Sequence, residues 1–163
     1  MKDFKDLIKE NLDNYQRTTT YKEILKNDIK DRKWLKPILI LLEYFATDDI
    51  SPNEIKINRK LQVEHILPQR KPKKNPQEFT DEERKDSIYK LGNLTLLYGR
   101  KNIQASNKSF SEKMEIYQNK DGLRTCFEST QRIYQFYTPW NPDELKNRQN
   151  EMIKKINEKL DIF

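Results

Sequence analysis

Apolar residues recur at helical spacing over most of the chain. Residues 3–15 carry them at i, i+3 and i+4 positions, and residues 21–31 repeat the pattern more weakly. Both segments predict amphipathic helices, because this spacing places apolar side chains on one helix face. Residues 34–45 are apolar on nearly every side, which predicts a buried central helix.

Four further helices are expected in the second half of the chain. Thr80 and Glu83 have capping-box spacing, which predicts a helix that extends to about residue 90. A second helix is expected from Ser109, and a third is expected to end before Pro139. The last is predicted over residues 142–160, with an asparagine directly before it as the N-cap.

Two short segments have the character of strands. Residues 61–67 alternate and are followed by a proline, and residues 93–98 are a short apolar run. The polar segment 99–107 is expected to be irregular. The predicted fold class is α+β, mostly α-helical, with the small strand-containing unit embedded among helices.

The expected organisation is one domain in three consecutive parts. Residues 1–58 form a helical part that packs on the core, residues 59–118 contain the strands, and residues 119–163 add helices that complete the domain. The longest apolar run spans five residues, 38–42, far below the ~20 that a bilayer span needs. No membrane association is expected, and the expected compartment is the cytoplasm. A single cysteine excludes an internal disulfide.

Positive charge is concentrated in one third of the chain. The net charge is +6, and residues 59–110 hold 12 Lys and Arg against 6 Asp and Glu, which accounts for all of it. Such clustering suits a polyphosphate partner, because neutralising phosphates releases condensed counterions. A solvated basic loop would show the same charge, so charge alone does not decide between the two.

Four polar residues, Glu64, His65, Asn93 and Asn102, lie in the segment that contains the predicted strands. His65 is the only histidine of the chain, and histidine is the side chain whose ordinary pKa suits proton transfer near neutral pH. Phosphodiester cleavage requires a base for water and a cation on the phosphate. Three of them also have structural alternatives: His65 could be a satisfied structural histidine, Glu64 a surface carboxylate, and Asn93 the cap of a turn after Gly92.

The motif at residues 63–68, Val-Glu-His-Ile-Leu-Pro, resembles the opening motif of HNH (His-Me finger) endonucleases. Asn93 and Asn102 stand where that family has its middle asparagine and its last metal ligand. Residues 34–163 as a whole resemble the HNH domain at the C-terminus of GmrSD-type, modification-dependent restriction enzymes. The segments that carry this similarity include Leu-Gly-Asn-Leu-Thr-Leu-Leu at 91–97 and Ser-Asn-Lys-Ser-Phe-Ser-Glu-Lys at 106–113.

The resemblance implies a ββα-metal motif in which His65 deprotonates water and Asn93 braces the loop that carries His65. It also implies that Glu64 and Asn102 hold a divalent cation. Carboxylate and amide oxygens suit Mg²⁺ or Mn²⁺ better than zinc. The glutamate at position 64, where many HNH proteins have aspartate, lengthens that ligand by one carbon.

Several basic or polar residues around the expected site are candidates for contacts with DNA phosphates. They are Arg70, Lys71, Lys73, Lys74, Arg100, Lys101, Asn107, Lys108 and Lys113. Asn107 has an alternative role as the N-cap of the helix that follows it.

The predicted function is metal-dependent hydrolysis of DNA phosphodiester bonds in restriction or phage defence of modified DNA. Related enzymes imply a nucleotide-hydrolysing partner, either as an N-terminal domain or as a separate subunit. The alternative is a catalytically inactive, HNH-derived DNA-binding module. A third interpretation, an interaction domain built on the N-terminal helices, rests only on their amphipathic pattern.

Overall fold

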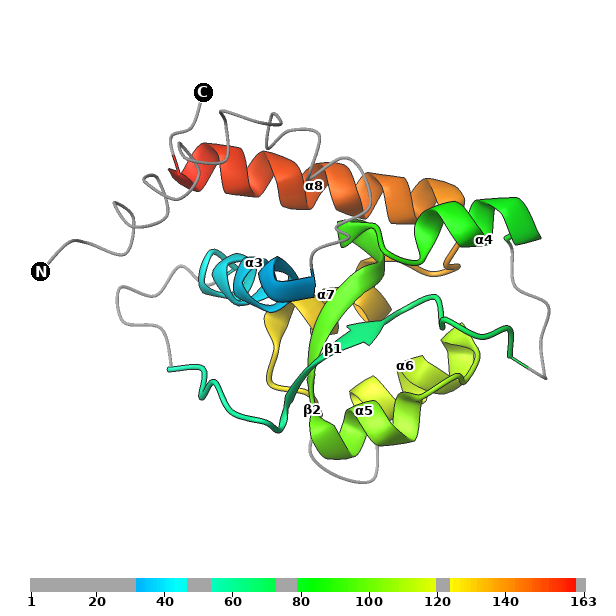
Figure 1. Cartoon of the computed structure of the whole chain (residues 1–163), viewed down its shortest axis with the longest axis horizontal. Helices are drawn as coiled ribbons and strands as arrows, with labels where there is room; N and C mark the ends of the chain where they lie inside the picture. The colour runs from blue at the N-terminus through cyan, green and yellow to red at the C-terminus, as the bar shows by residue number, and fades with distance from the viewer. Residues whose placement is uncertain (1–31, 47–53, 73–78, 120–123, 161–163) are drawn as a thin grey trace, which may run out of the picture.

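A two-stranded antiparallel sheet lies at the centre of the structure, with helices around it (Figure 1). The computed structural model describes residues 32–46, 54–72, 79–119 and 124–160. Strand β1 (Leu61–His65) pairs with β2 (Leu94–Tyr98), with Leu61 opposite Tyr98 and His65 opposite Leu94. Both predicted strands are confirmed, although β1 ends at His65 rather than two residues later.

Six α-helices surround the sheet in the described residues. They are α3 (Arg32–Tyr44), α4 (Asp81–Ser87), α5 (Gly99–Ala105), α6 (Phe110–Gln118), α7 (Glu128–Phe136) and α8 (Pro142–Leu160). A 3-10 turn, η1 (Leu91–Asn93), directly precedes β2. This mostly helical α+β fold confirms the predicted class. The helices expected over 3–15 and 21–31 lie outside the described residues. No helix in the described segments is long and apolar enough to cross a membrane.

Both faces of the sheet are buried. Leu94 and Leu96 belong to a hydrophobic cluster with α3 and the C-terminal half of α8. Leu97, which points to the opposite face, belongs to a second cluster with residues of α5, α6 and α7. Because the two clusters clamp the strands between them, the carboxyl end of β1 has a fixed position.

Helix α5 differs from the prediction, which expected residues 99–107 to be irregular. Ile103 is 78% exposed and Ala105 is fully buried, so the segment lacks the apolar periodicity that identifies a helix from sequence. Its N-cap residue, Tyr98, makes no side-chain capping hydrogen bond. The helix packs against both strands and against α6, so its signal is tertiary rather than local.

The helix-capping predictions hold at two ends and fail at a third. Asn141 Oδ1 accepts a hydrogen bond from the Glu144 amide at 2.9 Å, as expected for the N-cap of α8. The capping box of Thr80 and Glu83 opens α4, which ends at Ser87, three residues earlier than predicted. Helix α6 is capped by Ser109, so the alternative role of Asn107 as its N-cap is wrong.

Candidate active site

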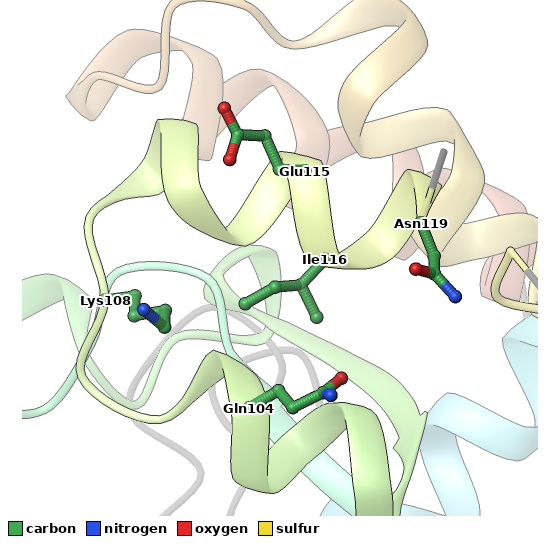
Figure 2. Close-up of a pocket in the computed structure, with 5 residues that line it drawn as sticks. All are labelled: Gln104, Lys108, Glu115, Ile116 and Asn119. Atoms are coloured by element: carbon green, nitrogen blue, oxygen red, sulfur yellow. The ribbon is translucent and has the colours of Figure 1, made fainter. Parts of the chain in front are cut away.

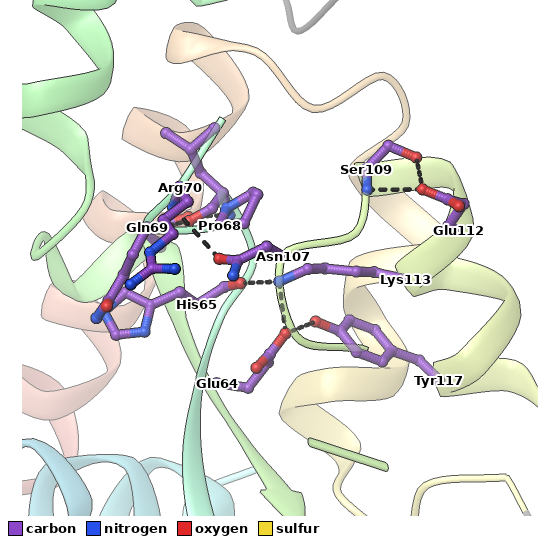
Figure 3. A network of polar contacts seen from close by, with 12 residues as sticks. Glu64, His65, Pro68, Gln69, Arg70, Asn107, Ser109, Glu112, Lys113 and Tyr117 are labelled. Carbon is purple, nitrogen blue, oxygen red and sulfur yellow. Dashed lines mark hydrogen bonds and ion pairs between the residues drawn. The ribbon is translucent and has the colours of Figure 1, made fainter. Parts of the chain in front are cut away.

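Glu64 and His65 are consecutive residues at the end of β1, and their side chains point in different directions (Figure 3). Glu64 is 5% exposed, whereas His65 is only half-buried. The Nε2 atom of His65 lies 3.2 Å from the side-chain nitrogen of Gln69. The Tyr89 ring meets the imidazole edge-on, with centroids 5.8 Å apart. Gln69 and Tyr89 therefore orient an imidazole that solvent still reaches.

Asn93 holds the loop that follows His65. Its side-chain oxygen accepts from the Leu67 amide at 2.6 Å, and its side-chain nitrogen donates to the carbonyls of Leu67 and Ile88 at 3.1 and 3.0 Å. Its main-chain carbonyl accepts from the Ile66 amide at 2.9 Å. Asn93 is fully buried, and its two side-chain bonds to Leu67 are buried with it, whereas the bond to Ile88 is partly buried. The geometry is that of a brace between η1 and the loop.

The carboxylate of Glu64 lies in a buried polar cluster with two residues of α6 (Figure 3). Lys113 Nζ is 2.6 Å from Glu64 Oε1, and the Tyr117 hydroxyl donates to the same oxygen at 3.1 Å. Lys113 also donates to the main-chain carbonyl of His65 at 2.5 Å. Burial raises the pKa of Glu64 and lowers that of Lys113, but their short ion pair opposes both shifts. The 2.6 Å contact is therefore that of a carboxylate with an ammonium.

The burial of Lys113 alters one sequence-based expectation. We expected Lys113 to contact DNA, but its side chain is 0% exposed and its ammonium is enclosed by Glu64 and the His65 carbonyl. That ammonium is not accessible to a phosphate, so Lys113 acts as an internal partner of Glu64 and not as a DNA contact. Asn107 is exposed, and its Oδ1 accepts from the Arg70 amide at 3.3 Å, which ties the loop after β1 to the turn before α6.

Asn102 offers an oxygen that is suited to a cation. It lies on α5, and its side-chain Oδ1 is buried and makes no hydrogen bond within the described part of the chain. A buried acceptor without a donor costs free energy, and a bound cation would satisfy it. Glu64 fits less simply, because Oε1 already accepts from Lys113 and Tyr117, so a cation would have to use Oε2. Within the described residues, no three His, Cys, Asp or Glu side chains form a metal-binding group.

The remaining basic candidates differ in their accessibility. Arg70 and Arg100 are exposed. Lys71 and Lys108 are also exposed, but Lys71 pairs with Asp81 at 2.8 Å and Lys108 with Glu112 at 3.7 Å. Lys101 is half-buried and donates to the Ile116 carbonyl at 2.8 Å. Lys73 and Lys74 lie outside the described residues.

A shallow depression lies between α5 and α6 (Figure 2). It is lined by Gln104, Lys108, Glu115, Ile116 and Asn119. Its lining includes one acidic and one basic residue, so it does not have the uniform positive charge that would favour a nucleic-acid backbone.

Sequence reasoning assigned no role to three residues that support the site. Gln69 follows His65 by four positions in the same loop, and this proximity was a usable signal. Tyr89 gave no local signal, and Arg148 is notable in the sequence only because it fits the resemblance to the family, which gives it no role. Arg148 reaches the site through hydrogen bonds to carbonyls more than 50 residues away in the sequence.

Comparison with known proteins assigns the chain to a family. Residues 11–155 match the family model described as GmrSD restriction endonucleases, C-terminal domain. A comparison with curated proteins gave no match. The matched region contains both strands, the buried Glu64–Lys113 pair and most of α8. Because the model covers most of the sequence, this chain belongs to the family of C-terminal domains of GmrSD restriction endonucleases.

Proposed function

We propose that this domain is an HNH-type endonuclease that hydrolyses DNA phosphodiester bonds with a divalent metal ion, and that His65 is its general base. The observation that carries the proposal is the setting of this histidine. It is half-exposed, its ring contacts Gln69 and Tyr89, and the loop behind it is bonded to Asn93. A base held in one orientation but open to solvent can take a proton from an attacking water.

Gln69 has a specific part in this proposal. An amide can present either its oxygen or its nitrogen to the imidazole, and the two ends are nearly equivalent in size. If the amide oxygen of Gln69 faces the ring, Nε2 would carry the proton of the neutral imidazole and donate a hydrogen bond to that oxygen. The lone pair of Nδ1 would then accept the proton of water, so Gln69 would select the active tautomer.

A metal ion would bind Asn102 through its buried Oδ1 and Glu64 through the oxygen that Lys113 leaves available. When bound, Mg²⁺ or Mn²⁺ supplies charge that stabilises the phosphate during attack. The protein's own contribution is to hold these two oxygens in place. Lys113 fixes the carboxylate of Glu64, and the packing of α5 on both strands fixes the helix that carries Asn102.

DNA is the proposed substrate. Among the candidates within the described residues, the exposed Arg70 and Arg100 are the proposed phosphate contacts, because their side chains are in none of the ion pairs found there. Lys71 and Lys108 would have to exchange carboxylates for phosphates. We further propose that the domain acts on modified DNA in restriction or phage defence in the cytoplasm. Family membership supports a nucleotide-hydrolysing N-terminal domain or subunit as its partner.

The second candidate is a DNA-binding module that has lost cleavage. The ion pair of Glu64 with Lys113 favours it, because the ammonium competes with a metal ion for the carboxylate. The two candidates differ in one respect: only the nuclease requires His65 for a covalent change in DNA.

Plasmid cleavage tests the proposal. The purified domain is incubated with supercoiled plasmid and Mg²⁺, Mn²⁺ or EDTA, alongside His65→Ala prepared in parallel. The variant should lose ~10² to 10⁴-fold in rate, the range for removal of a general base, with DNA affinity retained. Gln62→Ala, also on β1 and half-buried, is the matched control and should cleave normally. Cleavage by His65→Ala at the wild-type rate would refute the mechanism, and activity in EDTA would refute the metal requirement.

A further inference from the structure

The long C-terminal helix α8 packs unusually closely against η1, the turn that ends in Asn93. A Cβ atom added to Gly92 would lie 2.4 Å from the Leu145 carbonyl oxygen and 2.8 Å from Gln149 Cβ. Real Cβ atoms do not approach backbone this closely, so only glycine permits the contact. The Gly92 amide donates to Gln149 Oε1 at 3.2 Å.

Arg148 makes the central contact between α8 and this turn. Its Nη1 donates to the carbonyl of Gly92 at 2.6 Å and to the carbonyl of Leu94 at 3.0 Å. These two residues directly precede and follow Asn93. One nitrogen atom of Arg148 therefore fixes the backbone on both sides of the asparagine.

Burying the charged side chain of Arg148 costs free energy that an apolar side chain filling the same space would not. Arg148 is 3% exposed, and burial lowers the pKa of its guanidinium. In the described residues no carboxylate forms an ion pair with it. Apolar side chains of similar volume usually serve a core as well as a buried charge does, or better. The specific gain from arginine at this position is the pair of bonds to the η1 backbone.

The bonds continue from η1 to the proposed base. Asn93 contacts both the amide and the carbonyl of Leu67, and its own carbonyl accepts from the Ile66 amide. Ile66 and Leu67 directly follow His65 in the chain. The connection from α8 to His65 therefore consists of buried hydrogen bonds and two peptide units.

We propose that Arg148 is a positioning residue for His65, acting through the backbone of η1 and the side chain of Asn93. The catalytic meaning of this role rests on the proposed function, whereas the positioning itself does not. Gly92 and Gln149 assist by allowing the close approach of α8 and by binding the η1 amide. Loss of the Arg148 bonds would let Asn93 shift and release the loop behind the imidazole.

The sole histidine makes a direct test possible, because its imidazole C–H resonances need no assignment. Arg148→Met removes the donors and keeps a long side chain, and Arg148→Lys restores one cationic nitrogen donor directed at the same carbonyls. The control, Ile156→Ala, removes a buried contact two turns further along α8. We expect Arg148→Met to move the His65 resonances and to lower the maximal cleavage rate at least tenfold. DNA affinity should change less than twofold.

Arg148→Lys should restore the resonances most of the way, and Ile156→Ala should lower thermal stability without moving them. If Arg148→Met does not fold, Arg148→Gln takes its place. Unchanged resonances in the folded variant would overturn the proposal, as would failure of both variants to fold, which would assign Arg148 a purely structural role. If the wild-type protein cleaves no DNA, the proposed function fails, yet the resonances still decide whether Arg148 positions His65.

Discussion

Replacing Lys113 with methionine should destabilise the domain more than any single change on its surface. The variant keeps the length of the side chain but leaves the Glu64 carboxylate without its cation and the His65 carbonyl without its donor. Both side chains are almost fully buried, at 0% and 6% exposure. Removing one member of a buried ion pair typically costs about 3 to 5 kcal/mol. This is a large part of the roughly 5 to 15 kcal/mol that stabilises a domain.

The chain supplies its own control for this measurement. Lys108 pairs with Glu112 at 3.7 Å, but those side chains are 45% and 40% exposed. Lys108→Met should therefore cost at most about 0.5 kcal/mol, the value for an exposed pair four residues apart on a helix or its flank. Urea unfolding followed by tryptophan fluorescence measures both variants, since Trp140 is buried and reports on the core.

The pH dependence sharpens the test. Without Lys113, the pKa of Glu64 in the folded state should rise further above its unfolded value, because only the weaker hydrogen bonds from Tyr117 and the His65 backbone then oppose the effect of burial. A group with a raised folded pKa stabilises the fold at low pH and loses that contribution as pH increases through the folded pKa. The deficit of Lys113→Met should thus be smaller at pH 5 than at pH 8. A deficit below 1 kcal/mol at pH 8, or one equal to that of Lys108→Met, would refute the ion pair as a stabilising contact.

Three further predictions concern the site. Asn93→Ala leaves the Leu67 amide and carbonyl unpaired in the core, so it should cost roughly 2 to 5 kcal/mol in urea unfolding; a neutral effect would mean that water replaces the brace. Asn102→Ala should raise the Mg²⁺ concentration that half-saturates cleavage, and an unchanged Mg²⁺ titration would exclude Asn102 as a ligand. Arg70→Ala and Arg100→Ala should each lower the log-log salt slope of DNA binding by about 0.9, measured by fluorescence anisotropy across salt concentrations; an unchanged slope would mean no phosphate contact.

Features with a local origin could be predicted from the sequence. The Asn141 cap of α8 and the capping box of α4 depend on residues three positions apart, and both form as expected. The strands were predictable because alternation and apolar runs identify a buried sheet. Helix α5 was not, since its outward-facing Ile103 and small Ala105 give no clear face.

The partners of the candidate site were harder to predict than its residues. A family resemblance draws attention to Glu64 and His65, but it does not reveal that Lys113, 49 positions later, binds that carboxylate in the core. Lysine is rarely fully buried, so the lysine at position 113 is naturally taken for a surface charge. Only the packing of α6 against β1 identifies it as an internal counter-ion.

The order in which the chain is synthesised determines when α8 can contact η1. Gly92 leaves the ribosome well before Arg148, which is 56 residues further along the chain. At roughly 5 to 20 residues per second, the η1 segment has been synthesised for roughly 3 to 11 s before Arg148 of α8 is added. During that interval the loop behind His65 lacks the support of α8. A nascent chain of this length contains the residues of both strands and His65, and we expect its site to be completed only when α8 docks on η1.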